Sequence, residues 1–290
     1  MSVTETSSTV VTEPTQVSAG RQFVEAYQRD GRDARVELDY TITAGLGGTR
    51  RKPRRPTRYL LKNVVYLNQQ PRRAYWHETA AGPDDPGVEH GEERRELANR
   101  FHSSPIPQLL PTTAWVQLAP GLVEDPVAFE AFLNARLIMR LGTAENHTLL
   151  SGEGGLLNMP QIGRLSDIAP FESGLLAACD AVEQIGCTAD GIVMNPLDYY
   201  RYLETGRLMQ TLDENGVFIV RTRLVAPGSA LVGDFGHGAQ LFDAGRTSIS
   251  VAEPPPGTFV EQDGDTLAVK AEIWERVVLN LPFTFHLVTL

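Results

Sequence analysis

The chain has 290 residues, enough for one large or two moderate hydrophobic cores, and a formal net charge of −10 at pH 7. The acidic balance argues against a protein whose main partner is nucleic acid. No apolar run is long enough to cross a bilayer, and the N-terminus lacks the basic and apolar regions of a secretory signal. We therefore expect a cytoplasmic protein with neither nucleic acid nor membrane among its partners.

The sequence carries no motif for catalysis or metal binding. The two cysteines, Cys179 and Cys187, fit neither a disulfide framework nor a zinc pair, and their aliphatic surroundings predict buried free thiols. The six histidines show no metal-binding spacing, and no nucleophile-elbow motif occurs. The glycine-rich residues 151–155 follow a predicted helix, whereas a phosphate-binding loop precedes one. We expect no catalytic residues, no metal and no cofactor.

The N-terminal region divides into three parts. Residues 1–19 are mostly Ser, Thr, Val, Glu and Pro, a composition that predicts a mobile tail. Phe23, Val24 and Tyr27 follow at helical spacing and predict a short amphipathic helix. Residues 45–58 hold three Gly, two Pro and six basic residues, which predicts an extended arm.

A long polar hairpin is predicted next. Strand-like runs over 64–67 and 74–76 precede a polar stretch over 79–94, and another strand-like run lies near 97–101. Two-stranded hairpins are marginally stable alone, and compact monomers rarely contain long loops without a function. We therefore expect this hairpin to lie on another subunit.

The strongest helix signal begins at Asp125, a favourable N-cap residue followed by Pro126 at the first helical position. One apolar stripe continues for about seven turns until the glycines of 151–155 end the helix. Shorter helices are predicted over 171–185 and 196–203. The stripe of the long helix contains Phe129, Phe132, Leu133, Leu137, Ile138 and Leu141.

The C-terminal part of the chain has the periodicity of strands. Over 267–287 most odd-numbered positions are apolar, and Glu272, Arg276 and Asn280 alternate with them, which predicts one long strand or a bent pair. A weaker alternation over 36–42 predicts another strand. Helices followed by strands that return to cover a long helix predict an α+β fold.

Several short segments follow one another in a characteristic order: TrpHisGlu (76–78), the helix end at 145–154, GlyIleValMetAsnPro within 191–200, LeuValGlyAspPhe (231–235), LeuPheAsp (241–243) and the final alternating strands. In this order they resemble the major capsid protein fold of tailed phages (Hong Kong 97-like) and, within that superfamily, the encapsulins. The resemblance covers roughly residues 59–290, and it implies an α+β fold with an N-terminal arm, an extended loop, a long spine helix, a peripheral domain and an axial domain.

The resemblance also implies domain boundaries. The short stretch ahead of the extended loop leaves too little room for the scaffolding segment of many phage proteins, which favours an encapsulin. The expected parts are a mobile tail and arm (1–58), an extended loop (59–103), a peripheral domain with the spine helix (104–165), an axial domain (166–235) and the return strands of the peripheral domain (236–290).

The function implied by the resemblance is structural and not enzymatic. We expect a subunit that assembles with copies of itself into an icosahedral nanocompartment and encloses a cargo enzyme carrying a short targeting peptide. One alternative is the major capsid protein of a tailed phage or prophage, which packages DNA. An alternative of a different class is an enzyme on an unrecognised α+β scaffold, for which no catalytic cluster is found in the sequence.

Candidate contact residues follow from the same resemblance. In encapsulins the N-terminal helix and the adjoining peripheral domain dock the cargo peptide, so Phe23, Val24 and Tyr27 are candidate cargo-facing residues. The alternative for this stripe is packing into the peripheral domain of its own chain or of a neighbour.

The basic run over residues 50–58 also has two interpretations. It could contact nucleic acid or an anionic cargo, or it could pair with acidic residues of an adjoining subunit. The acidic net charge favours the second interpretation. The candidate inter-subunit residues are Trp76, Glu78, Asp84, Asp85, Arg54 and Arg55.

Overall fold

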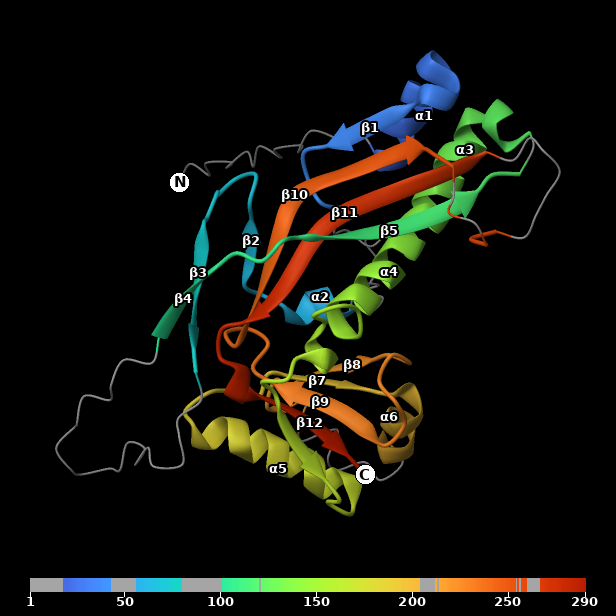
Figure 1. Ribbon diagram of the computed structural model, residues 1–290. Helices are drawn as coiled ribbons and strands as arrows, with labels where there is room; N and C mark the ends of the chain where they lie inside the picture. The colour runs from blue at the N-terminus through green and yellow to red at the C-terminus, as the bar shows by residue number, and fades with distance from the viewer. Residues whose placement is uncertain are drawn as a thin grey trace, which may run out of the picture.

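The computed structural model describes two five-stranded sheets, a separate two-stranded hairpin and a long helix (Figure 1). This architecture confirms the predicted α+β class. The described residues are 18–42, 56–79, 101–119, 121–203, 212, 214–253, 255, 257–259 and 267–290.

Runs of consecutive strands lie before and after the helical middle part of the chain. The helices are α1 (Ala19–Asp30), α2 (Pro56–Leu60), α3 (Pro126–Phe132), α4 (Ile138–Leu150), α5 (Phe171–Gln184) and α6 (Pro196–Leu203). The strands are β1 (Arg35–Leu38), β2 (Val64–Tyr66), β3 (Ala74–Glu78), β4 (Phe101–Pro105), β5 (Leu110–Gln117), β6 (Gly163–Ser166), β7 (Gly191–Met194), β8 (Phe218–Arg221), β9 (Ser229–Gly233), β10 (Ala239–Val251), β11 (Ala268–Leu279) and β12 (Phe285–Thr289).

The predicted long helix is present and begins where expected. The Asp125 side chain accepts hydrogen bonds from the first free backbone N–H groups of α3, and Pro126 occupies the first turn. α3 continues through a π-helical segment, Leu133–Leu137, directly into α4. The helix ends at Leu150, and Gly154 adopts a left-handed φ of +64° in the turn that follows. The glycines after α4 therefore terminate a helix, as predicted.

The first sheet packs against this helix. Its strand order is β1-β10-β11-β5, and β2 pairs in parallel with β10. The odd-numbered residues of β11 face the helix, as the period-two pattern predicts. Figure 1 shows the α3–α4 helix running along one face of the sheet. The core between them includes Phe129, Leu133, Leu137, Leu141, Ile249, Val269, Ala271 and Ile273.

The predicted strand over 267–287 is a bent pair whose two halves belong to different sheets. β11 ends at Leu279, and the 3-10 turn Pro282–Thr284 redirects the chain because proline cannot donate a ladder hydrogen bond. β12 then pairs with β9 and β6 in the second sheet, which has the order β6-β12-β9-β7-β8. The last segment of the chain therefore connects the two sheets.

The second sheet is covered by α5. The apolar face of α5 packs on β7, β9 and β12, and α6 follows β7 directly. The helices predicted over 171–185 and 196–203 are thus confirmed. The core beneath α5 includes Phe171, Leu175, Ala178, Val182, Ile192, Val232 and Val288.

The cysteines are free but less buried than predicted. Cys179 and Cys187 are both half-buried, because they lie on α5 and just after its end. Burial and the nearby Glu183 raise the pKa of Cys179 to about 11. Burial, with Asp234 and Glu78, also raises the pKa of Cys187. Both thiols are therefore neutral near pH 7.

Across the described residues, no helix combines the length and the apolar character that crossing a membrane requires.

Candidate assembly interface and its buried support

The apolar stripe of α1 belongs to the core of its own chain. Phe23 has 0% exposure and Val24 is buried. The edges of the Phe23 and Tyr27 rings meet Phe129 of α3, with centroid separations of 6.2 Å and 5.6 Å. The cargo-facing prediction is therefore wrong for Phe23 and Val24 in this conformation, because the long helix already covers them. Tyr27 is only partly buried.

The basic run also needs a correction at its last residue. Arg58 on α2 does not face solvent or a neighbouring subunit: its side chain is only 7% exposed and pairs within its own chain. The two basic residues among the inter-subunit candidates, Arg54 and Arg55, lie outside the described residues, as do Asp84 and Asp85. Their predicted inter-subunit pairing stays a prediction.

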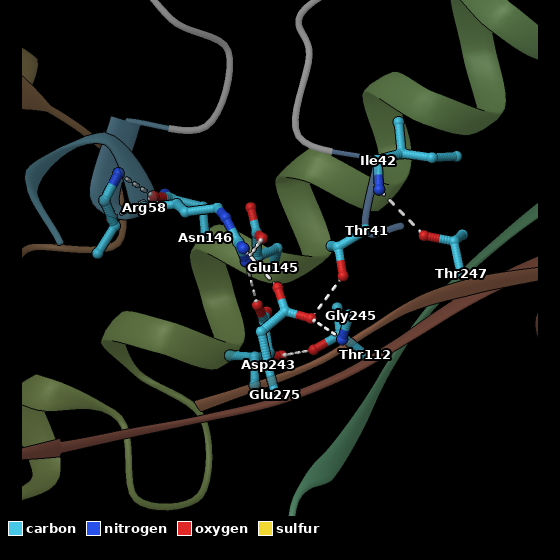
Figure 2. Close-up of polar contacts among 12 residues, drawn as sticks. Thr41, Ile42, Arg58, Thr112, Glu145, Asn146, Asp243, Gly245, Thr247 and Glu275 are labelled. Carbon is cyan, nitrogen blue, oxygen red and sulfur yellow. Dashed lines mark hydrogen bonds and ion pairs between the residues drawn. The ribbon is translucent and has the colours of Figure 1, made fainter. Parts of the chain in front are cut away.

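Three buried carboxylates converge on Arg58 (Figure 2). Nη1 donates to Glu145 Oε1 of α4 at 3.1 Å and to Glu275 Oε2 of β11 at 2.9 Å. Nη2 donates to Asp243 Oδ2 of β10. The three carboxylate side chains have no exposed surface. One guanidinium therefore joins α2, the long helix and two strands of the first sheet.

The electrostatics of this cluster keep Arg58 charged. Burial by itself lowers the pKa of Arg58, because it disfavours the charged form. The negative charges of Glu145, Asp243 and Glu275 outweigh this effect and raise the pKa above its ordinary value. The planar guanidinium, which presents five N–H donors, suits several carboxylates at once.

Further polar groups complete the cluster. Asp243 Oδ1 accepts from Thr41 Oγ1 at 2.5 Å and from the Gly245 backbone N–H at 2.7 Å. Beside it, Asn146 Oδ1 accepts from the hydroxyl and the backbone N–H of Thr57, and its Nδ2 donates to Thr222 Oγ1 at 3.3 Å. These bonds attach residues on both sides of the segment 43–55 to one buried site. Burial of charge is tolerated because every ion has a partner.

The carboxylates of the cluster were not singled out in the sequence, although one signal was available. Glu275 occupies an odd-numbered position in β11, so the alternation itself places a charged side chain on the buried face. A charge on a buried face requires an opposite charge. No comparable signal marks Glu145 or Asp243.

The β3–β4 hairpin extends from the first sheet and is the best candidate for contact between subunits (Figure 1). The Trp76 side chain is 65% exposed on one face of this hairpin. The opposite face is anchored at its base, where the Tyr75 ring meets Phe242 of β10 at a centroid separation of 5.9 Å. Glu78 is half-buried, and its backbone N–H donates to the Asn280 carbonyl at 2.8 Å. Among the candidates, Trp76 thus presents the apolar surface expected of an interface.

A second group of exposed apolar side chains lies at the second sheet. Tyr59 of α2 and Phe218 on the edge strand β8 pack together at a centroid separation of 5.0 Å, and both rings are about half exposed. Leu197 and Tyr200 are exposed on α6. Large exposed apolar side chains concentrate at protein–protein interfaces.

The described residues hold no group of three or more side chains suited to a metal ion.

Comparison with known proteins finds one similar sequence and several similar structures. The chain is 25% identical over 171 residues to the major capsid protein of Enterobacteria phage HK97, a match that covers 51% of this chain and 43% of the phage protein. No family model matches the sequence. The matched part is thus less than half of the phage protein's length.

Solved structures share the fold over most of the chain. The capsid of an empty GTA particle aligns with a TM-score of 0.51 at 16% identity, covering 87% of this chain and 94% of that one. The holo-SrpI encapsulin complex from Synechococcus elongatus PCC 7942 aligns with a TM-score of 0.51 at 13% identity, covering 86% and 91%. The virus-like particle from Pyrococcus furiosus aligns with a TM-score of 0.50 at 12% identity, covering 78% and 88%.

The long helix, the sheet packed on it, the second sheet and the projecting hairpin form the fold of the capsid and encapsulin structures that align with this chain. More specifically, the chain has the fold of the superfamily that contains the HK97-type major capsid proteins and the encapsulins. The resemblance inferred from the short segments is thereby confirmed.

Proposed function

We propose that the chain is a self-assembling subunit of a closed icosahedral protein shell. The main support is the projecting β3–β4 hairpin, which exposes Trp76 on a strand pair that is marginally stable unless it is covered. Closed symmetric assemblies are the usual way in which copies of one chain cover such surfaces. Within this class we favour an encapsulin that encloses a cargo protein in the cytoplasm.

The assembly itself is the first test. Size-exclusion chromatography and negative-stain microscopy of the full chain should show closed shells tens of nanometres across, formed without a scaffold protein. A discrete monomer or dimer at micromolar concentration, over a range of salt, would contradict the proposal.

A phage capsid subunit is the second candidate, and the sequence match to the HK97 major capsid protein favours it. The contents of shells purified from the native cell distinguish the two candidates. A single co-purifying protein supports an encapsulin. Nuclease-protected DNA of uniform length supports a phage capsid.

Trp76 provides a prediction for the interface. Trp76→Ala should leave the subunit folded, because the side chain is largely exposed, and should abolish or strongly reduce shell formation. Buried tryptophans at interfaces commonly contribute about 2 kcal/mol or more each, and the loss is repeated at every contact in the shell. Light scattering at matched concentrations measures the effect. Trp76→Phe, which retains most of the apolar area, serves as the control and should still assemble. Normal assembly of Trp76→Ala would show that Trp76 does not contribute to the interface between subunits.

A further inference from the structure

The β3–β4 hairpin brings together two histidines that are distant in sequence. His77 and His102 lie directly opposite each other in its antiparallel register. Their ring centroids are 5.7 Å apart, and the ring planes are inclined by 36°. Directly opposed residues project from the same face of a strand pair, with Cβ atoms about 4.5–5.5 Å apart. Residues 78–101 separate the pair, so no short sequence motif reveals it.

The geometry suits one shared metal ion. Zn–N bonds of about 2.0–2.1 Å place the centroids of two imidazoles that bind the same ion about 5 Å apart. The observed separation of 5.7 Å lies close to this value. Nδ1 of His77 is buried and has no hydrogen-bond partner among the described residues. An ion held between the rings would supply a partner for this nitrogen.

The first of the two ligands is held in place by its neighbours. The Tyr75 ring lies on the same face as His77, at a centroid separation of 5.6 Å, and it also contacts Phe242 of β10. The next residue, Glu78, is bonded through its backbone to Asn280. His77 is therefore partly preorganised, whereas His102 is exposed and can adjust.

We propose that His77 and His102 form a binding site for a divalent transition-metal ion such as Zn²⁺, with water in the remaining positions. Imidazole nitrogen suits zinc, copper and nickel, whereas magnesium and calcium prefer oxygen ligands. The net charge of −10 favours cations near the protein. The bound ion joins β3 to β4, two strands whose paired residues are far apart in the sequence, and such a link between distant parts of a chain is stabilising. The site goes beyond the proposed shell function and does not depend on it.

Calorimetric titration of the full chain with ZnCl₂ tests the site, in whichever assembly state the protein adopts. We expect one ion per chain with a dissociation constant in the micromolar range, and no corresponding signal with MgCl₂. His102→Asn should weaken binding at least about tenfold, since even changes to residues around a metal site commonly cost that much. His147→Asn is the matched control, because His147 is an exposed histidine on α4, and it should bind as wild type does.

Hydrogen exchange gives a second readout. Zn²⁺ should slow amide exchange in β3 and β4 of the wild type and leave the His102→Asn hairpin unchanged. His102 is exposed, so this variant should fold even if His77→Asn does not. The proposal is overturned if the wild type has no stoichiometric site. It is equally overturned if His102→Asn binds zinc with unchanged affinity, because the ion then lies at other histidines.

Discussion

Arg58→Ala should destabilise the protein by about 3–5 kcal/mol, which is typical of removing one partner from a buried ion pair. The substitution leaves Glu145, Asp243 and Glu275 inside the protein without the guanidinium that now pairs with all three. Urea denaturation followed by circular dichroism, at matched protein concentration, measures the change.

The control for this variant lies four residues away. Lys62 also forms an ion pair, with Asp190 at 3.1 Å, but its side chain is 60% exposed. Exposed pairs contribute about 0–1 kcal/mol, so Lys62→Ala should change the midpoint little. Equal effects of the two substitutions would show that the buried cluster contributes no more than a surface pair. Arg58→Lys keeps the charge but loses the planar set of donors, so it should fall between wild type and Arg58→Ala.

Phe129→Ala should cost about 3–5 kcal/mol, the usual range for removing a fully buried aromatic side chain. Phe129 lies at the N-terminal end of the long helix and contacts the rings of Phe23 and Tyr27. The substitution therefore opens a cavity between α1 and α3, and it should lower both the unfolding midpoint and the soluble yield.

A neighbouring residue provides the matched control for Phe129. Val127 is on the same helical turn but is 79% exposed, so Val127→Ala should stay within about 0.5 kcal/mol of the wild type. Wild-type stability of Phe129→Ala would mean that α1 does not pack on the long helix in solution. Hydrogen exchange would then show α1 unprotected in the wild type as well.

The buried cluster has a consequence for assembly. Arg58 and Thr57 stand at the point where the chain leaves the segment 43–55 and turns toward β2 and the hairpin. Their contacts with the long helix and the first sheet fix this starting point. A hairpin that clasps a neighbour must be held firmly by its own subunit. We therefore expect Arg58→Ala to impair shell formation even under conditions in which it remains folded.

The sequence by itself determined the elements whose signals are local. Asp125 and Pro126 mark the start of the long helix, because capping and the missing proline N–H act within one turn. Likewise, the period-two pattern of β11 identifies its buried face, since side chains alternate along any strand. The order of these elements with several short segments was enough to indicate the capsid fold.

Only the tertiary structure decided which distant residues meet. The sequence left open whether Phe23 and Val24 face a cargo or the core, because an amphipathic stripe shows that a face is covered but not by what. Arg58 looked like part of a basic run that contacts another molecule, yet its partners come from three other elements of its own chain. Such pairings depend on strand register and helix packing over long sequence separations, which local propensity does not encode. The same holds for His77 and His102, which become neighbours only through the register of β3 and β4.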